Sequence, residues 1–279
     1  MIIYIEKAAT ICYNLNMKNY FEYKTTYNEI SFCLTDKPSI DEREIHSYNE
    51  ILYFIDGDCE LLTKDGQHPL KNNSVLVFPA EAYHFFNLKR TEAFTRLKIG
   101  FPSHILENTA VERIISDIKI FENPNENVLH VLDRLCSILK GQTEQTGFCT
   151  YSAFLMLVSE LDFSKNEEKP FFSAKNELIT DLTEYISEHL SESLDVKRLS
   201  KKLHISPSGI AHLFKKELGI SLHKYILQKR LIYAQKLIVK GQKPSKIYSD
   251  SGFSDYSSFY KAYLKFFGYP PSEEKVNRN

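Results

Sequence analysis

SLDVKRLSKKLHISPSGIAHLFKKELGISLHKYILQKRLIYAQKLIVKG (residues 193–241) and GFSDYSSFYKAYLKFFGYPPSEEK (residues 252–275) are the two stretches that decide the fold of the C-terminal part of this chain. Both carry apolar residues at helical spacing, separated by turn and capping signals. Ser206 is a good N-cap residue and Pro207 suits the first helical position, so a helix begins there.

One pattern occurs twice in this region. Residues 195–218 and residues 244–267 each read as a short helix, a tight turn and a longer helix. Residues 222–240 between them predict one long helix, and Gly241 closes it. We therefore expect about seven helices within residues 176–279, organised as two helix-turn-helix units.

Each unit leaves a small and polar face on its second helix. A recognition helix needs such a face because its N-terminal half must fit into a major groove about 12 Å wide. Exposed tyrosines beside a lysine in the second unit suit contacts with phosphates, sugars and thymine methyls. The alternatives are an ordinary solvated helix in the first unit and tyrosines that cover a local apolar patch in the second. The candidate DNA-binding residues are Ser206, Ser208, Gly209, His212, Lys215 and Lys216 in the first unit, and Tyr256, Ser257, Tyr260 and Lys261 in the second.

The charges divide unevenly along the chain. Residues 176–279 contain 17 Lys+Arg and 11 Asp+Glu, a formal charge of +6. Residues 1–175 contain 18 Lys+Arg and 25 Asp+Glu, a formal charge of −7, so the whole chain carries −1. An acidic front half and a basic back half indicate that only the back half meets a polyanion.

The cysteines and the N-terminus bear on the cellular compartment. Five cysteines, an odd number without a CxxC pair, exclude a disulfide framework and a zinc ribbon. The first ten residues, MIIYIEKAAT, contain charges at Glu6 and Lys7, and the longest apolar run, residues 153–158, is too short to span a bilayer. We expect a cytoplasmic protein with reduced thiols and no membrane partner.

The front half predicts strands followed by helices. Short segments rich in β-branched and aromatic residues recur between turn signals within residues 20–100, which is typical of an antiparallel barrel or jelly roll. The clearest are residues 51–55, 59–63, 74–78 and 94–99. The apolar period then changes, and three helices are expected.

The domain boundaries follow from these patterns. We expect a sensor and dimerisation domain over residues 1–162, with its barrel at about 20–100 and its helices at about 103–162. A polar linker that contains Pro170 follows over residues 163–175, and residues 176–279 form the DNA-binding domain.

The two quoted stretches resemble the AraC/XylS family of transcription regulators across roughly a hundred residues. The resemblance rests on the spacing of LFKKELGIS, YILQKRLIYAQKLI, GFSDYSSF and FFGYPPSE. It implies a two-domain α+β protein with a cupin-like antiparallel β-barrel plus helices, followed by an all-α domain with two helix-turn-helix units joined by one long helix. His212 departs from the family's habit, since an arginine is common there.

The front half resembles a cupin in part. His46-x-Tyr48-x-Glu50 matches part of the first cupin motif, and Pro79-x-Glu81-x-x-His84 matches part of the second. His46, Glu50 and His84 could hold a metal with an open position. The other interpretation, which we adopt, is a metal-free pocket for a small polar ligand. The candidate pocket residues are His46, Tyr48, Glu50, Tyr53, His84 and Phe86.

Apolar residues at near-heptad spacing mark the helices of residues 128–161. They favour a homodimer interface, as the resemblance also does, and the alternative is packing onto the barrel. The candidate interface residues are Leu132, Leu135, Leu139, Phe154 and Leu155.

The sequence therefore predicts a sequence-specific, DNA-binding transcription regulator rather than an enzyme, with no catalytic residues and no cofactor. The resemblance implies an activator, although the sign of regulation depends on where the site lies relative to a promoter. The expected partners are double-stranded DNA, a small-molecule effector, RNA polymerase and a second copy of the chain. Two alternatives stay open, a metal-dependent cupin enzyme with a DNA-binding tail and a regulator controlled by a partner protein without any ligand.

Overall fold

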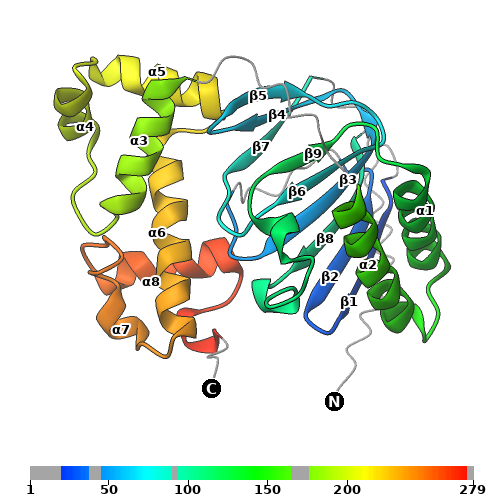
Figure 1. The fold of residues 1–279 in the computed structure, drawn as a ribbon. Coiled ribbons are helices and arrows are strands. Elements are labelled where there is room, and N and C mark those ends of the chain that lie inside the picture. Colours follow the sequence, from blue (N-terminus) through cyan, green and yellow to red (C-terminus); the bar gives the residue numbers. More distant parts are fainter. Residues whose placement is uncertain (1–19, 38–44, 90–93, 165–175, 275–279) are drawn as a thin grey trace, which may run out of the picture.

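The computed structural model of the chain describes residues 20–37, 45–89, 94–164 and 176–274. Figure 1 shows the strands on one side of the molecule and most helices on the other. The strands are β1 (Glu22–Tyr27), β2 (Ile30–Thr35), β3 (Asn49–Gly57), β4 (Cys59–Thr63), β5 (Gly66–Pro69), β6 (Ser74–Phe78), β7 (His84–Leu88), β8 (Phe94–Phe101) and β9 (Lys119–Phe121). The α-helices are α1 (Glu126–Gly141), α2 (Thr146–Phe163), α3 (Glu177–Glu188), α4 (Val196–Leu203), α5 (Pro207–Leu218), α6 (Leu222–Val239), α7 (Pro244–Ile247) and α8 (Tyr256–Phe267).

The strands form two antiparallel sheets packed face to face. The larger sheet has the order β1-β2-β8-β3-β6-β9, and the smaller has the order β5-β4-β7. Each side chain of the larger sheet points to one of two cores, because successive residues of a strand face opposite ways. Ile51 and Tyr53 face α1 and α2, whereas Leu52 and Phe54 face the smaller sheet. The expected cupin-like arrangement is confirmed.

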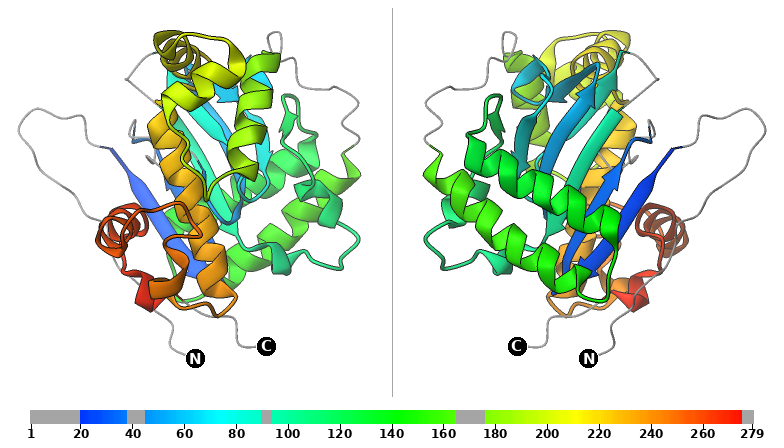
Figure 2. Two further views of the ribbon diagram at one scale, coloured as in Figure 1. Left: turned by 90° about the vertical axis from the view of Figure 1, so that its left-hand side faces the viewer. Right: turned by 90° about the vertical axis from the view of Figure 1, so that its right-hand side faces the viewer.

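Helices α1 and α2 cover one face of the larger sheet (Figure 2). Their buried stripes join the strand residues in a single apolar cluster, in which Phe154 of α2 contacts Phe32 and Phe101 edge-on. Asn125 caps the first of these helices, since its side chain accepts a hydrogen bond from Val128 N at 3.0 Å.

Residues 103–121 correct the sequence prediction. The apolar stripe there predicted an α-helix, but the chain forms the 3-10 helices η1 (Ser103–Ile105) and η2 (Glu112–Ile115), followed by β9. Asn108 has φ of 60°, a left-handed conformation that interrupts a right-handed helix. The prediction of residues 163–175 as a linker falls outside the described residues, except that Phe163 ends α2 and Ser164 caps it.

The C-terminal helices form two units that share α6. The first half of α6 contributes Leu222, Tyr225 and Ile226 to the core of the first unit, with α3, α4 and α5. The second half contributes residues such as Leu231 and Ile238 to the core of the second unit, with α7 and α8. One continuous helix therefore fixes the two units relative to each other, as the sequence predicts.

The C-terminal segment is fastened to the second unit by Glu274. Its Oε2 atom accepts hydrogen bonds from the Tyr263 hydroxyl at 2.5 Å, the Tyr269 hydroxyl at 2.9 Å and Gln235 Nε2 at 2.9 Å. The 3-10 helix η3 (Pro271–Glu273) brings this carboxylate back over α6 and α8.

The front part of the chain, which comprises the described residues before α3, contacts the first helix-turn-helix unit through the end of the smaller sheet. The Tyr83 hydroxyl donates to the Leu218 carbonyl, and Gln67 Nε2 donates to the Lys216 carbonyl at 3.2 Å. Ile45 and Tyr83 are buried in the same apolar cluster as Leu218. Two parts of the chain that are far apart in sequence thus share one core.

A second contact joins the two parts at Glu81, which has φ of 67°. Its carboxylate forms an ion pair with Lys236 of α6, and its carbonyl accepts a hydrogen bond from Lys229 at 3.5 Å. Gly219, at the end of α5, lies so close to Phe85 that a Cβ atom there would come within 2.6 Å of the ring.

Within the described ranges, no helix is both long enough and apolar enough to cross a bilayer.

Replacing Glu274 by alanine should destabilise the protein. The change leaves the buried Tyr263 hydroxyl without its acceptor, and an unsatisfied buried donor costs about 1–3 kcal/mol. Chemical denaturation of the full chain measures the loss. The neighbouring Glu273 is exposed, so Glu273→Ala serves as the control, and equal stability of the two variants would refute the role of Glu274.

Candidate nucleic-acid interface and ligand pocket

Helix α5 begins where its capping residues predict. Ser206 Oγ accepts a hydrogen bond from Gly209 N at 3.1 Å, and Pro207 takes the first helical position. His204 turns the chain between α4 and α5 with φ of 54°. A Cβ atom at Gly209 would lie 2.8 Å from the Ile205 side chain, so the tight turn favours glycine here.

The exposed face of α5 carries most of the side chains predicted for it. Ser208, His212 and Lys215 are exposed, while Ile210 and Phe214 are buried in the core of the unit. Lys215 Nζ donates to the Gly219 carbonyl at 2.5 Å, so in this structure its ammonium lies at the C-terminal end of the helix.

Lys216 lies toward the front part of the chain. Its carbonyl accepts the hydrogen bond from Gln67, and its side chain lies 3.5 Å from the Glu217 carboxylate. This position separates Lys216 from the N-terminal end of α5, where a recognition helix meets base edges.

Helix α8 repeats the construction of α5. Asp255 caps it, since Oδ1 accepts from Ser258 N at 2.8 Å and Oδ2 accepts from Ser258 Oγ at 2.8 Å. Gly252, with φ of 80°, makes the preceding turn. A Cβ atom there would lie 2.1 Å from the Leu190 carbonyl oxygen and 2.4 Å from Arg230 Nε, so only glycine fits.

The two tyrosines of α8 are exposed on its outer face. Tyr256 is 39% exposed and Tyr260 is 36% exposed, and their ring centroids are 6.2 Å apart. Tyr256 also touches Phe259, so part of its ring covers the core, as the alternative interpretation had it. Ser257 and Lys261 beside them are exposed.

A cavity of about 370 Å³ lies in the front part, on β1, β2, β8 and β3. The strand registers place Lys24, Cys33 and Lys98 in one row across the sheet, and Glu22, Thr35 and Arg96 in the next. These side chains lie on the same face of the larger sheet that, at β3 and β6, packs against the smaller sheet. The charged residues that line the cavity are Glu22, Lys24, Lys37, Glu50, Arg96 and Lys98.

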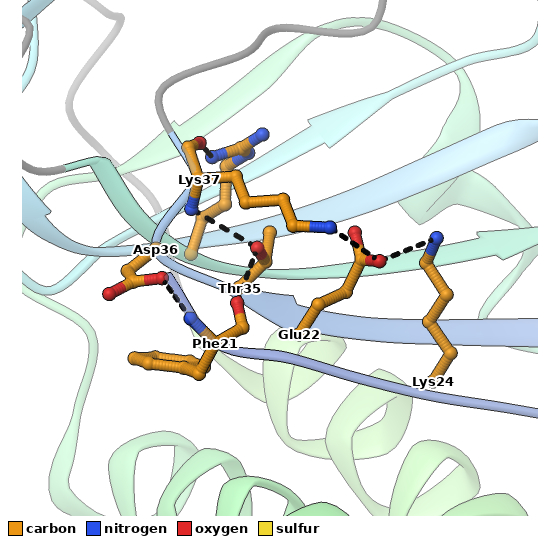
Figure 3. A network of polar contacts seen from close by, with 7 residues as sticks. Phe21, Glu22, Lys24, Thr35, Asp36 and Lys37 are labelled. Carbon is orange, nitrogen blue, oxygen red and sulfur yellow. Dashed lines mark hydrogen bonds and ion pairs between the residues drawn. The ribbon is translucent and has the colours of Figure 1, made fainter. Parts of the chain in front are cut away.

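Glu22 stands between two lysines at the β1 side of the cavity (Figure 3). Its Oε2 atom lies 2.9 Å from Lys37 Nζ and 3.1 Å from Lys24 Nζ. Burial acts to raise the pKa of the Glu22 carboxyl, but hydrogen bonds from the two lysines and their charges outweigh it and leave the pKa below its usual value. The carboxylate therefore stays ionised and holds both ammonium groups.

Glu50 forms the inner end of the cavity and is fully buried. Its carboxylate oxygens lie 3.5 Å from Lys98 Nζ, 3.6 Å from His46 Nε2 and 4.0 Å from His84 Nε2. Burial raises the pKa of the Glu50 carboxyl, but the charge of Lys98 and then the interaction with His46 outweigh it, so the pKa lies below its ordinary value. Burial, assisted by His46, lowers the pKa of His84 to about 3, so this imidazole is neutral.

The six predicted pocket residues lie in four different places, and only two of them line the cavity. Tyr48 and Glu50 line the cavity, and His46 and His84 contact Glu50 behind it. Phe86 lies deeper, in the core between the sheets.

Tyr53 does not belong to the pocket. It sits three residues after Glu50 on β3, so it faces α1 and α2, where its hydroxyl donates to Asn73 Oδ1 at 3.0 Å. The cavity's cations were absent from the sequence prediction. Charged residues at alternate positions of β1 and β8, such as Arg96 and Lys98, are the signal that could have revealed them.

The histidines and Glu50 could also hold a metal, since their ligand atoms lie within 4.8 Å of one another. Lys98, however, places a fixed positive charge 3.5 Å from the same carboxylate. A divalent cation at that position would be repelled by the ammonium, so the donor set suits a lysine counter-ion better than a metal.

Comparisons with known proteins find relatives among transcription regulators. Residues 35–150 match the family model described as an AraC-like ligand binding domain, and residues 199–275 match a helix-turn-helix domain. The chain belongs to the AraC/XylS family. It is a DNA-binding regulator of this type, with an N-terminal ligand-binding domain.

Three AraC/XylS relatives illustrate the extent of the likeness. The probable transcriptional regulator LumQ of Photobacterium leiognathi is 34% identical over 137 residues, which are 49% of this chain and 51% of LumQ. The uncharacterized HTH-type transcriptional regulator YobQ of Bacillus subtilis (strain 168) is 26% identical over 230 residues, 81% of this chain and 85% of YobQ. The arabinose operon regulatory protein of Escherichia coli (strain K12) is 32% identical over 107 residues, 36% and 37% of the two chains.

The residues expected at a dimer interface of this AraC/XylS protein need correction. Leu132, Leu135, Leu139 and Phe154 are fully buried against the larger sheet, so they cannot reach a partner subunit. Only Leu155 is exposed. The near-heptad spacing reflects packing onto the barrel, which uses the same apolar stripe.

His212 is exposed on α5, at a position predicted to face the bases of DNA, and the family commonly has arginine there. We expect His212→Arg to tighten binding to the protein's specific DNA site, once that site has been mapped, by about tenfold, because arginine is the better bidentate donor to guanine. Competition binding measures the change. His212→Lys is the control, since it adds a charge without the fork, and equal gains by the two variants would show that the effect is only electrostatic.

Proposed function

We propose that this AraC/XylS family member is a cytoplasmic regulator that binds one bipartite DNA site with α5 and α8 together, under control of a small molecule in the N-terminal cavity. The observation that carries the proposal is the matched construction of the two helices. Each begins at a side-chain cap, Ser206 or Asp255. Each exposes hydroxyl-bearing side chains in its N-terminal half, while the opposite face of the helix is buried. Binding to chromosomal DNA requires that the protein be in the cytoplasm.

The long helix α6 supports simultaneous binding by both units. Its 18 residues span about 27 Å at ~1.5 Å per residue. Successive major grooves on one face of a duplex are about 34 Å apart. A rigid spacer of this size fits two adjacent grooves.

Charge supports a phosphate contribution around the two helices. The region of residues 176–279 carries a formal charge of +6. Exposed lysines of the preceding helices add to it, Lys197 and Lys201 on α4 and Lys246 on α7. The first helix of such a unit crosses the DNA backbone, so these lysines suit phosphate contacts.

The experiment that tests the proposal is genome-wide mapping of bound DNA, followed by quantitative binding to the mapped site. We expect affinity to fall steeply with salt, because each neutralised phosphate releases counterions. Lys261→Ala should weaken all sequences alike and reduce the slope of log affinity against log salt by about one. Lys140→Ala at the end of α1 is the control of equal charge. A slope unchanged by Lys261→Ala, or affinity independent of salt, would contradict the proposal.

A homodimer through α2 completes the proposed assembly. The outer face of this helix carries Phe148, Leu155, Met156 and Phe163, all exposed in the single chain. An apolar stripe of this kind on a soluble protein is typical of a surface that another molecule covers. The helix is already packed on the sheet by its other side, so it can offer this face without rearrangement.

The dimer is tested by charging its proposed face. We expect the full chain to sediment as a dimer at micromolar concentration and Met156→Glu to shift it toward the monomer, because the variant buries an unpaired carboxylate at the interface. Leu178→Glu on α3 is the control, since it charges another exposed apolar side chain away from this face. A wild-type monomer, or a dimer that survives Met156→Glu, would exclude this face.

RNA polymerase is the remaining proposed partner, as expected of an activator bound near a promoter. The lysine beside Glu50 disfavours the metal-dependent enzyme as an alternative. Control by a partner protein alone is disfavoured by the charged cavity, which a small ligand can fill.

A further inference from the structure

We infer that the cavity on β1, β2 and β8 binds a small hydroxylated organic anion, a sugar phosphate or a sugar acid. The inference deepens the proposed control by an effector and rests on that proposal. It names the chemical class of ligand, which is recognised by charge and hydrogen bonds more than by apolar contact.

The cavity has an excess of positive charge. Among the residues that the structure describes, four cations line it, Lys24, Lys37, Arg96 and Lys98, and two carboxylates do, those of Glu22 and Glu50. Glu22 is shared by Lys24 and Lys37, and one carboxylate cannot neutralise two ammonium groups. A bound anion would balance the second ammonium group of this lysine pair.

Arg96 is a prepared guanidinium at the centre of this charge. It is 5% exposed, and its Nη1 atom donates to the carbonyls of Lys37 at 2.8 Å and Phe94 at 2.9 Å. Its plane is also packed over the Phe94 ring, with the guanidinium carbon 4.3 Å from the ring centroid. A guanidinium fixed in this way loses little freedom when it binds a planar carboxylate or a phosphate.

The remaining lining is polar and suits a hydroxylated molecule. Hydroxyl groups of Thr26, Ser31 and Thr35 follow the same face of β1 and β2. The Ser31 hydroxyl lies 3.3 Å from the Gly100 carbonyl, at the edge of the cavity. Most of the described lining residues carry charged or hydroxyl groups, and few are apolar. A long hydrocarbon chain would therefore find little apolar surface to bury against.

Tyr48 provides one flat aromatic surface at the inner end. Its ring stacks on His46 with centroids 4.0 Å apart and planes 3° apart. Gly100 of β8 lets the ring lie close to the strand, since a Cβ atom there would lie 3.0 Å from the Tyr48 ring. A sugar ring could lie against this surface while its anionic group reaches the lysines.

The test is isothermal titration of the full chain with four sets of probes. These are hexose and pentose phosphates, the corresponding aldonates, the neutral parent sugars and inorganic phosphate. We expect at least one phosphate or aldonate to bind at least tenfold more tightly than its neutral parent and than inorganic phosphate. Comparing phosphates with aldonates identifies the anionic group. Failure of every organic anion, or equal binding by the neutral sugar or by inorganic phosphate, would overturn the inference.

Variants then assign the binding to this cavity. The double variant Lys24→Gln/Lys37→Gln should weaken anion binding at least tenfold, and Lys89→Gln should not. Lys89 is a matched control because it is half-exposed and lies 3.9 Å from Glu60 on the smaller sheet, outside the cavity. The single variant Lys24→Gln, at a side chain that is 63% exposed, gives a second test that does not disturb folding. Unchanged binding by both variants would overturn the inference.

DNA binding by the same samples separates this inference from the proposed function. Normal DNA binding without any anion binding would refute the ligand class and leave the regulator intact. Anion binding without DNA binding would refute the proposed regulator and leave the cavity's ligand class standing.

Discussion

The alternation of side chains across the larger sheet is the constraint on which the front part of the molecule depends. Every residue of β3 and β8 must face either α1 and α2 or the smaller sheet. Apolar residues fill the helix side along the whole sheet. On the other side, apolar packing continues only where the smaller sheet covers it, and charged residues follow toward β1. The cavity exists because the pattern changes along one face while the other stays apolar.

The sequence was informative where local chemistry decides the structure. Helix α5 begins where Ser206 and Pro207 predicted, because the Ser206 side chain bonds to a backbone amide within the same turn. Strands β4 and β6 likewise end at the turn signals beside them. Glycines such as Gly252 were recognisable as turns, although the contact with Arg230 that makes glycine necessary comes from a distant helix.

The errors arose where packing between distant segments decides. The apolar side chains within residues 105–118 have a helical period. The chain nevertheless forms two 3-10 helices there, and these side chains pack against the core of the larger sheet. Tyr53 was grouped with Glu50 by proximity in sequence, although a separation of three residues on a strand places them on opposite faces. The stripe on α1 and α2 could be assigned to a partner or to the chain's own sheet, and periodicity alone does not distinguish these. The cavity's lysines and Arg96 are brought together by strand pairing, which a single sequence does not reveal.

Two neighbouring pairs of residues give the molecule a short connection between detection and response. His46 and His84 face Glu50 inside the barrel, whereas Ile45 and Tyr83, one residue earlier in each case, are buried in the core of the first helix-turn-helix unit. A rotation of either backbone segment that shifts an imidazole also shifts its neighbour within this core, and Tyr83 is bonded through its hydroxyl to the Leu218 carbonyl at the end of α5. A displacement of either histidine would therefore reach the core of the first helix-turn-helix unit across one peptide bond, between residues 45 and 46 or between residues 83 and 84. This coupling depends on Ile45 and Tyr83 and not on the identity of the ligand. The residues that line the cavity can therefore change to fit other molecules while the contact with the first helix-turn-helix unit is kept.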